Sequence, residues 1–173
     1  FFHADDGIRD FCLSRGLGDV YKRQRYFLDN GQRDNHYDIG ALNLNNGERI
    51  WGKPFGTLGN IWPAGDSLFL VNDLSQLVRM DKYSGDIVWS VQLPSFLKIN
   101  PRKSKEVVAH FGPIVASGKV ILVSSDKKIR VFNPIDGSLI DDVTVPSGAT
   151  SNPVIVDNIL YFVSRDGDLH AFR

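Results

Sequence analysis

Short apolar runs separated by turn residues recur along the chain after Gln24. Between residues 111 and 145, four runs rich in Val, Ile and Phe have the length of strands: residues 111–116, 120–124, 129–132 and 139–145. Gly, Asp, Asn and Pro fill the gaps between them, which is typical of antiparallel hairpins. No window of 11 residues beyond Gln24 carries a convincing helical stripe. The pattern predicts an all-β fold.

The strand pattern repeats at a regular distance. Three turns end in a glycine before the next strand, at Gly47, Gly85 and Gly137, which are 38 and 52 residues apart. A second series repeats with a step of 40 residues, from Pro113 to Pro153. Four short strands in a unit of about 40 residues are typical of a β-propeller blade. We therefore expect residues 25–173 to form a partial β-propeller of about four four-stranded antiparallel blades.

The longer step of 52 residues is explained by an insertion at residues 95–106, SFLKINPRKSKE. Long loops in compact domains are often functional. We expect a partner-binding surface there, formed by two apolar and four basic residues: Phe96, Leu97, Lys98, Arg102, Lys103 and Lys105. A charged run of this length is also common in loops that only contact solvent. Both interpretations remain open from the sequence.

Residues 1–24 do not share the repeat. They show no regular apolar period, and they lack the apolar segment of a signal peptide. Residues 10–24 resemble translated sequencing-adapter DNA. We expect residues 1–24 to be a non-native or disordered extension; a natural, poorly ordered extension is the alternative. The segment contains Cys12, which is the only cysteine of the chain.

Charge and hydropathy narrow the classes of partner. The chain has 20 Lys and Arg residues against 20 Asp and Glu residues, so its formal net charge is zero. This balance removes the bulk electrostatic argument for a nucleic-acid partner. The apolar runs, such as residues 120–123, are far shorter than the roughly 20 residues of a membrane-spanning helix. We expect neither a nucleic-acid partner nor a transmembrane segment.

Residue types with reactive chemistry are present but scattered. Three histidines lack the spacing of a metal site: His36, His110 and His170. Residues 124–126, Ser-Ser-Asp, lack the glycines of a nucleophile elbow. Residues 165–168, Arg-Asp-Gly-Asp, lack the other oxygen ligands of a Ca²⁺ loop. We expect no catalytic, metal-binding or cofactor-binding residues, and we expect that the protein is not an enzyme.

The glycine turns carry a family resemblance. Gly47 is followed by Trp51, and Gly85 by Trp89, each after a short segment such as Ala-Leu-Asn at residues 41–43. This motif resembles the PQQ-like (quinoprotein-type) propeller repeat, which implies that each indole docks on the neighbouring blade. After Gly137 the equivalent position holds Asp141. We expect a weaker contact at that blade.

A narrower resemblance involves several segments in order: residues 62–66, 89–94, 111–113, 123–126 and 166–173. Together they resemble the C-terminal half of the propeller lipoproteins of the bacterial outer-membrane protein assembly (BAM) machinery. That resemblance implies an eight-bladed propeller, of which this chain holds an open arc with exposed edge strands that favour association. It also implies a non-enzymatic, periplasmic scaffold, associated with the outer membrane and lipid-anchored in its full-length form. The implied partner is the periplasmic region of the barrel-inserting subunit.

Two other functions use the same repeat. One is a fragment of a PQQ-dependent dehydrogenase, a class that resembles a propeller with a vicinal disulfide; a chain with a single cysteine cannot form that bond. The other is a general propeller module that binds peptide or polysaccharide. The gene neighbourhood would separate these alternatives, since a cytochrome or dehydrogenase gene nearby would favour redox chemistry.

Overall fold

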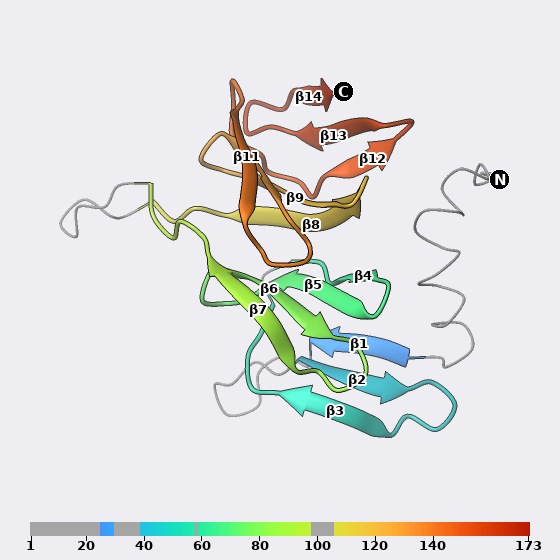
Figure 1. Cartoon of the computed structure of the whole chain (residues 1–173). Coiled ribbons are helices and arrows are strands. Elements are labelled where there is room, and N and C mark those ends of the chain that lie inside the picture. Colours follow the sequence, from blue (N-terminus) through green and yellow to red (C-terminus); the bar gives the residue numbers. More distant parts are fainter. Residues whose placement is uncertain (1–24, 30–38, 58, 98–105) are drawn as a thin grey trace.

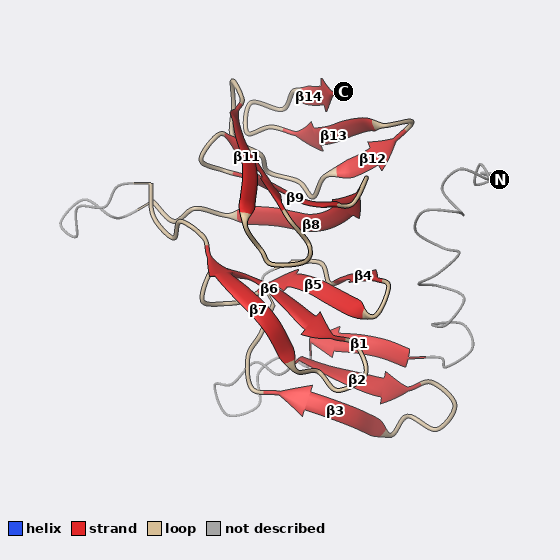
Figure 2. Cartoon of the chain, viewed as in Figure 1, coloured by secondary structure: helices blue, strands red, loops and turns tan. Residues whose placement is uncertain are grey.

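The computed structural model describes residues 25–29, 39–57, 59–97 and 106–173 of the chain. These residues form fourteen strands and contain no helix (Figure 2). The prediction of an all-β fold is therefore confirmed.

The strands form four antiparallel sheets, and within each sheet neighbouring strands follow one another in the sequence. Sheet 1 consists of β1 (Arg25–Asp29), β2 (Ile39–Asn43) and β3 (Arg49–Lys53). Sheet 2 consists of β4 (Trp62–Ala64), β5 (Ser67–Val71), β6 (Gln76–Asp81) and β7 (Ile87–Gln92). Sheet 3 consists of β8 (His110–Ala116), β9 (Lys119–Ser124), β10 (Lys128–Phe132) and β11 (Leu139–Thr144). Sheet 4 consists of β12 (Val154–Val156), β13 (Ile159–Val163) and β14 (Leu169–Phe172).

The four sheets follow one another face to face in an open arc, from blue at sheet 1 to red at sheet 4 (Figure 1). Sheets 2 and 3 have the expected four strands. Sheets 1 and 4 have three strands each among the described residues, which is fewer than the sequence pattern predicted. The arrangement is that of consecutive propeller blades, as expected.

The hydrophobic core is divided among the contacts between successive sheets. In β5, Leu68 and Leu70 pack in the cluster shared with sheet 1, whereas Phe69 and Val71 pack in the cluster shared with sheet 3. All five residues of β5 are buried because both faces of sheet 2 are covered. This explains why the strands in the sequence are continuous apolar runs instead of alternating ones.

Tight turns join the third and fourth strands of the middle sheets. In sheet 2 the carboxylate of Asp81 accepts hydrogen bonds from the Tyr83 and Ser84 amides, both at 2.8 Å. The Ser84 amide makes the largest contribution to holding the pKa of Asp81 below its ordinary value. Gly85 follows with φ +72° and Gly137 of sheet 3 with φ +75°, a conformation in which a side chain is strained. The tryptophans of the preceding sheets pack on these turns.

Candidate functional site

The insertion between sheets 2 and 3 begins with a short ladder. Phe96 and Val107 form an isolated antiparallel bridge, and the Leu97 amide donates to the Glu106 carbonyl at 3.1 Å. Phe96, Leu97 and Val107 are 48%, 45% and 66% exposed. The ladder therefore presents apolar side chains to solvent. The four basic residues predicted to share this surface lie outside the described residues: Lys98, Arg102, Lys103 and Lys105.

The first tryptophan of the repeat joins sheets 1 and 2. The Trp51 indole NH donates to the Lys82 carbonyl at 3.1 Å. A Cβ atom added to Gly85 would lie 2.6 Å from Cε3 of the Trp51 ring. The indole thus rests directly on the glycine of the next turn, and the Lys53–Asp86 ion pair at 2.9 Å lies beside it.

The second tryptophan joins sheets 2 and 3 in the same way. The Trp89 indole NH donates to the Pro134 carbonyl at 3.1 Å, and the Arg79 guanidinium donates to the same oxygen at 3.0 Å. A Cβ atom on Gly137 would lie 2.8 Å from Cε3 of Trp89. Gly85 and Gly137 are therefore each needed for two reasons: the turn has a positive φ at that position, and the indole lies too close to leave room for a side chain.

A buried polar network lies where the contact between sheets 2 and 3 reaches the end of β7 and the start of β8. The sequence did not predict it. His110 lies 2.9 Å from the Pro94 carbonyl through Nε2 and 2.8 Å from the Ser124 hydroxyl through Nδ1. The Pro94 oxygen can only accept, so Nε2 carries the proton and Nδ1 accepts from Ser124. Arg130 donates to the Ser124 oxygen at 3.1 Å and pairs with Asp126.

This network has the residue types of a nucleophile and base, but it is closed to substrates. Ser124 is 0% exposed and His110 is 5% exposed. Burial lowers the pKa of His110, which keeps the ring neutral at physiological pH. The network therefore holds β8 to the end of sheet 2 instead of forming a reaction site. No motif or spacing in the sequence predicted that Ser124 and His110 would lie together.

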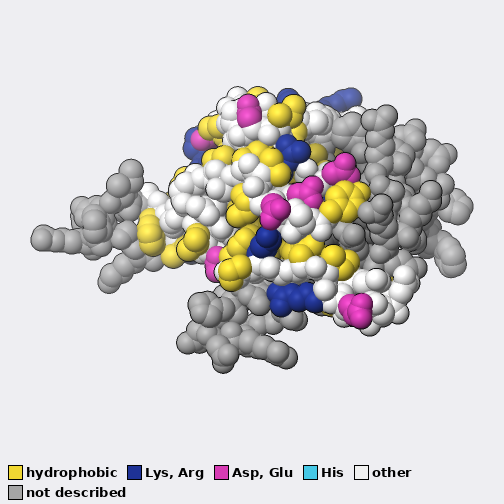
Figure 3. Space-filling model, turned by 60° about the horizontal axis from the view of Figure 1, so that its bottom comes forward, with side chains coloured by type: hydrophobic (Ala, Val, Ile, Leu, Met, Phe, Trp, Pro, Cys, Tyr) yellow, Lys and Arg dark blue, Asp and Glu magenta, His cyan; other side chains and the backbone are white. Residues whose placement is uncertain are grey.

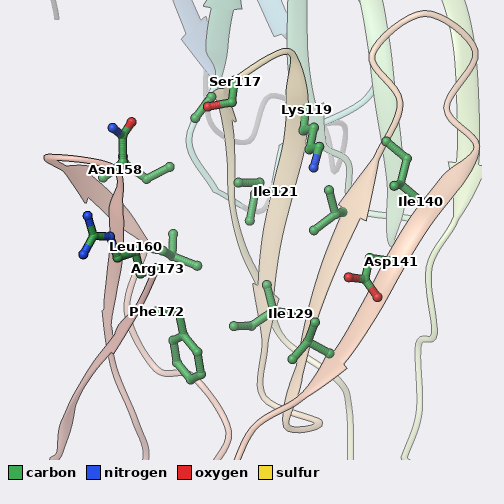
Figure 4. Close-up of a pocket in the computed structure, with 14 residues that line it drawn as sticks. Ser117, Lys119, Ile121, Ile129, Ile140, Asp141, Asn158, Leu160, Phe172 and Arg173 are labelled. Atoms are coloured by element: carbon green, nitrogen blue, oxygen red, sulfur yellow. The ribbon is translucent and has the colours of Figure 1, made fainter. Parts of the chain in front are cut away.

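The contact between sheets 3 and 4 differs from the other two. Asp141 stands where sheets 1 and 2 have tryptophan, and beside it lies a pocket of about 450 Å³. Ile121 and Ile129 of sheet 3 line one side, and Leu160 and Phe172 of sheet 4 line the other (Figure 4). Lys119, Asn158 and Arg173 supply further polar groups at its margin. The pocket could hold an apolar group.

The rest of the surface is mixed. On the face that Figure 3 shows, hydrophobic side chains are interspersed with basic and acidic ones. Among the described residues, no group of three or more His, Cys, Asp and Glu side chains is placed to hold a metal ion. The described part of the chain also has no helix with the length and hydropathy needed to cross a membrane.

The chain matches known proteins both in sequence and in structure. A family model described as "Outer membrane protein assembly factor BamB" matches residues 30–91, which contain both glycine–tryptophan motifs. The protein of that name from Shewanella oneidensis is 27% identical over 130 residues, which are 75% of this chain and 30% of the relative. The crystal structure of BamB from Moraxella catarrhalis matches with a TM-score of 0.60 and 18% identity, over 79% of this chain and 42% of that chain. The chain is similar to BamB in sequence and in fold.

Other BamB relatives agree. The Alkalilimnicola ehrlichii BamB is 24% identical over 139 residues, covering 79% of this chain and 33% of the relative. The chain thus spans about a third of the length of these curated relatives. The WD40 β-propeller domain of Doa1 has the same fold, with a TM-score of 0.57 and 13% identity, over 81% of this chain and 47% of that chain. The expected resemblance to PQQ-like propeller repeats of the BamB type is confirmed.

Proposed function

We propose that this chain is part of a non-enzymatic scaffold protein that assists the assembly and insertion of outer-membrane β-barrel proteins. The observation that carries the proposal is the agreement between the family model at residues 30–91 and the relatives, which share the name outer membrane protein assembly factor BamB. The sheet contacts fit a scaffold, because the serine–histidine pair that most resembles reactive chemistry is buried within one of them.

The proposed partner is the periplasmic region of the barrel-inserting subunit of the BAM complex. We propose that the complete protein works in the periplasm at the outer membrane and is anchored there by a lipid. The binding surface proposed on this chain is the insertion between sheets 2 and 3. Its described base carries the exposed Phe96 and Leu97, and the sequence of its tip is basic.

A pull-down with the soluble periplasmic domains of that subunit tests the function. The immobilised chain should retain these domains, and addition of PQQ and Ca²⁺ should produce no dye reduction. Failure of the folded chain to retain them would contradict the proposal, and dye reduction would favour the dehydrogenase alternative.

A matched pair of variants tests the surface. Arg102→Glu with Lys103→Glu should reduce retention about tenfold or more without lowering Tm, because reversed charges at a docking surface repel a complementary partner. Lys119→Glu with Lys127→Glu makes the same change of charge at exposed positions of sheet 3 and should leave retention unchanged. Equal retention by both double variants would remove the loop from the proposal and leave the function standing.

A further inference from the structure

The turn between β2 and β3 contains an Asn-Gly pair, Asn46–Gly47. Asn46 is exposed, and among the described residues it is the only asparagine that glycine follows. Glycine has no Cβ, so it leaves its own backbone nitrogen unhindered. Such a nitrogen can attack the side-chain carbonyl of the asparagine before it. The turn therefore has the residue types for a spontaneous loss of the asparagine amide.

The exposure of Asn46 is a property of this kind of turn. The same position holds Ser84 in sheet 2 and Asp136 in sheet 3, and both of these residues are exposed. They are exposed although a tryptophan of the preceding sheet packs on the glycine that follows each of them. A further sheet packed on Gly47 would therefore leave Asn46 open to water in the same way.

Two hydrogen bonds fold the Asn46 side chain back over the Gly47 peptide. Its Oδ1 accepts from the Glu48 amide at 3.1 Å, and its Nδ2 donates to Oε2 of the Glu48 side chain at 2.7 Å. An asparagine that binds the amide two residues on bridges the peptide between them, which brings Cγ toward the Gly47 nitrogen. The Glu48 amide also points at the oxygen on which negative charge develops when Cγ is attacked.

The equivalent turns share this hydrogen bond but lack the reactive group. Ser84 accepts from the Asp86 amide at 3.2 Å, and Asp136 accepts from the Ser138 amide at 2.9 Å. A serine side chain has no carbonyl carbon to attack. The Ser138 amide makes the largest contribution to holding the pKa of Asp136 below its ordinary value, so that side chain stays ionised. A carboxylate resists attack by a nitrogen, which leaves Asn46 as the reactive member of the three turns.

We propose that Asn46 is a site of spontaneous deamidation. The Gly47 nitrogen gives up its 2.8 Å hydrogen bond to the Asn43 carbonyl, loses its proton to solvent and bonds to Cγ of Asn46. The Cγ–Nδ2 bond breaks, and the nitrogen takes up a proton and leaves as ammonia. Water then opens the succinimide ring at one of its two carbonyls, which gives aspartate or isoaspartate. The reaction consumes water and needs no oxidant or reductant, and it does not depend on the proposed function.

The products loosen the contact between sheets 1 and 2. Aspartate at residue 46 loses the amide that donates to Glu48 and places two carboxylates side by side. Isoaspartate adds a carbon atom to the backbone between the closing pair of the hairpin, in which the Asn43 amide donates to the Glu48 carbonyl at 2.8 Å. β3 carries Trp51, whose indole rests on Gly85, so a shift of β3 moves that indole.

Peptide mapping by mass spectrometry after incubation of the folded chain in mildly alkaline buffer provides the first test. The tryptic peptide of residues 34–49 should accumulate the acid form at Asn46, and a sample taken at time zero corrects for conversion during digestion. Conversion should be at least about tenfold faster than at Asn158, an exposed turn residue that isoleucine follows, because a β-branched side chain hinders the attacking nitrogen. The Asn-Gly pair at residues 30–31 lies in another tryptic peptide. Equal rates at Asn46 and Asn158, or no conversion at Asn46, would overturn the proposal.

A matched pair of glycine variants provides the second test and identifies the attacking nitrogen. Gly47→Ala should slow conversion at Asn46 about tenfold or more, because the added Cβ hinders the nitrogen. Gly65→Ala is the control: Gly47 has φ +71° and Gly65 has φ +57°, and a Cβ added to either would meet nothing within 4 Å. It introduces a similar backbone strain at another turn and should leave the rate at Asn46 unchanged. Equal rates in the two variants would mean that the Gly47 nitrogen is not the attacking group, which would overturn the mechanism.

Thermal melts of the same samples test the effect on the sheets. The parent chain should lose a few degrees of Tm as Asn46 converts, and Gly47→Ala should lose less over the same time. An unchanged Tm in a fully converted parent chain would overturn the loosening of the contact between sheets 1 and 2.

Discussion

The contact between sheets 2 and 3 and the contact between sheets 3 and 4 are built from the same repeat, yet their outer strands meet differently. In the first, Trp89 fills the space between the sheets and rests on Gly137. In the second, Asp141 takes the tryptophan position and a pocket of about 450 Å³ lies beside it. The inner strands pack through alternating aliphatic side chains in both contacts. The comparison indicates that aliphatic alternation stacks the sheets and that the indole closes their outer edge.

The two contacts also differ in how fully their buried polar groups are hydrogen-bonded. Ser124 is hydrogen-bonded to both His110 and Arg130. Ser164, 40 residues later and also at the end of the second strand of its sheet, is 1% exposed, and its hydroxyl has no hydrogen-bond partner in the described part of the chain. Buried hydroxyls without partners are uncommon because the lost hydration is not replaced. The buried polar groups are thus more completely hydrogen-bonded in the contact between sheets 2 and 3 than in the contact between sheets 3 and 4.

Removal of the Trp89 side chain should produce the largest effect. Trp89→Ala should lower the free energy of unfolding by about 3 kcal/mol or more, because it leaves a cavity and removes the hydrogen bond to Pro134. Asp141→Ala, at the equivalent position of sheet 3, should change it by less than about 0.5 kcal/mol. Denaturant unfolding of both variants measures the difference. Equal losses would show that the indole does not distinguish the two contacts.

The glycine beneath the indole gives the next largest effect. Gly137→Ala should cost about 3 kcal/mol, because it combines a positive φ with a Cβ atom 2.8 Å from Trp89. Gly118→Ala is the control: Gly118 has φ +68°, but an added Cβ would meet nothing within 4 Å. Its substitution should cost only about 1 kcal/mol. If thermal melts show the same loss of stability for both variants, the positive φ alone explains the glycine, and the Trp89 indole leaves room for a Cβ atom.

The sequence predicts the stacking of the sheets better than the details of each contact. Strand length, turn residues and the 40-residue step depend on local chemistry, so they predicted the all-β fold and the succession of blades. The glycine–tryptophan spacing also pointed to Asp141 as the exception. Among the described residues, sheets 1 and 4 show only three strands each; the repeat pattern did not predict this, because it describes a whole blade and not which of its strands pair.

The polar network shows why the rest was missed. His110, Ser124 and Pro94 come from three separate strand ends, and their spacing in the sequence resembles no motif. They meet where the first residue of β8 lies beside the carbonyl of Pro94, just after β7. The candidate surface on the insertion between sheets 2 and 3 stays a prediction, and four of its six residues lie outside the described part of the chain.

The two buried serines should respond differently to the loss of their hydroxyls. Ser124→Ala should lower the free energy of unfolding by about 1–3 kcal/mol, because Arg130 loses an acceptor and His110 loses a donor inside the protein. Ser164→Ala should leave stability unchanged or raise it slightly, since it removes a buried hydroxyl that has no partner among the described residues. Equilibrium unfolding measures both. A loss of similar size at Ser164 would mean that its hydroxyl is satisfied by bound water and that the two contacts are equally complete.

Acid should weaken the contact between sheets 2 and 3 through His110, with the smallest effect of the set. Burial makes the pKa of His110 lower in the folded chain than its ordinary value of about 6.5, so the unfolded chain binds a proton more readily. The stabilising contribution is therefore complete above about pH 6.5 and declines as the pH falls below it, by at most about 1.4 kcal/mol per pH unit. Denaturant midpoints measured between pH 7 and pH 5 should fall in the parent chain. In His110→Gln this part of the pH dependence should disappear, because glutamine has no proton to gain. An unchanged slope in the variant would assign the acid sensitivity to other groups and leave the His110 network without a role in it.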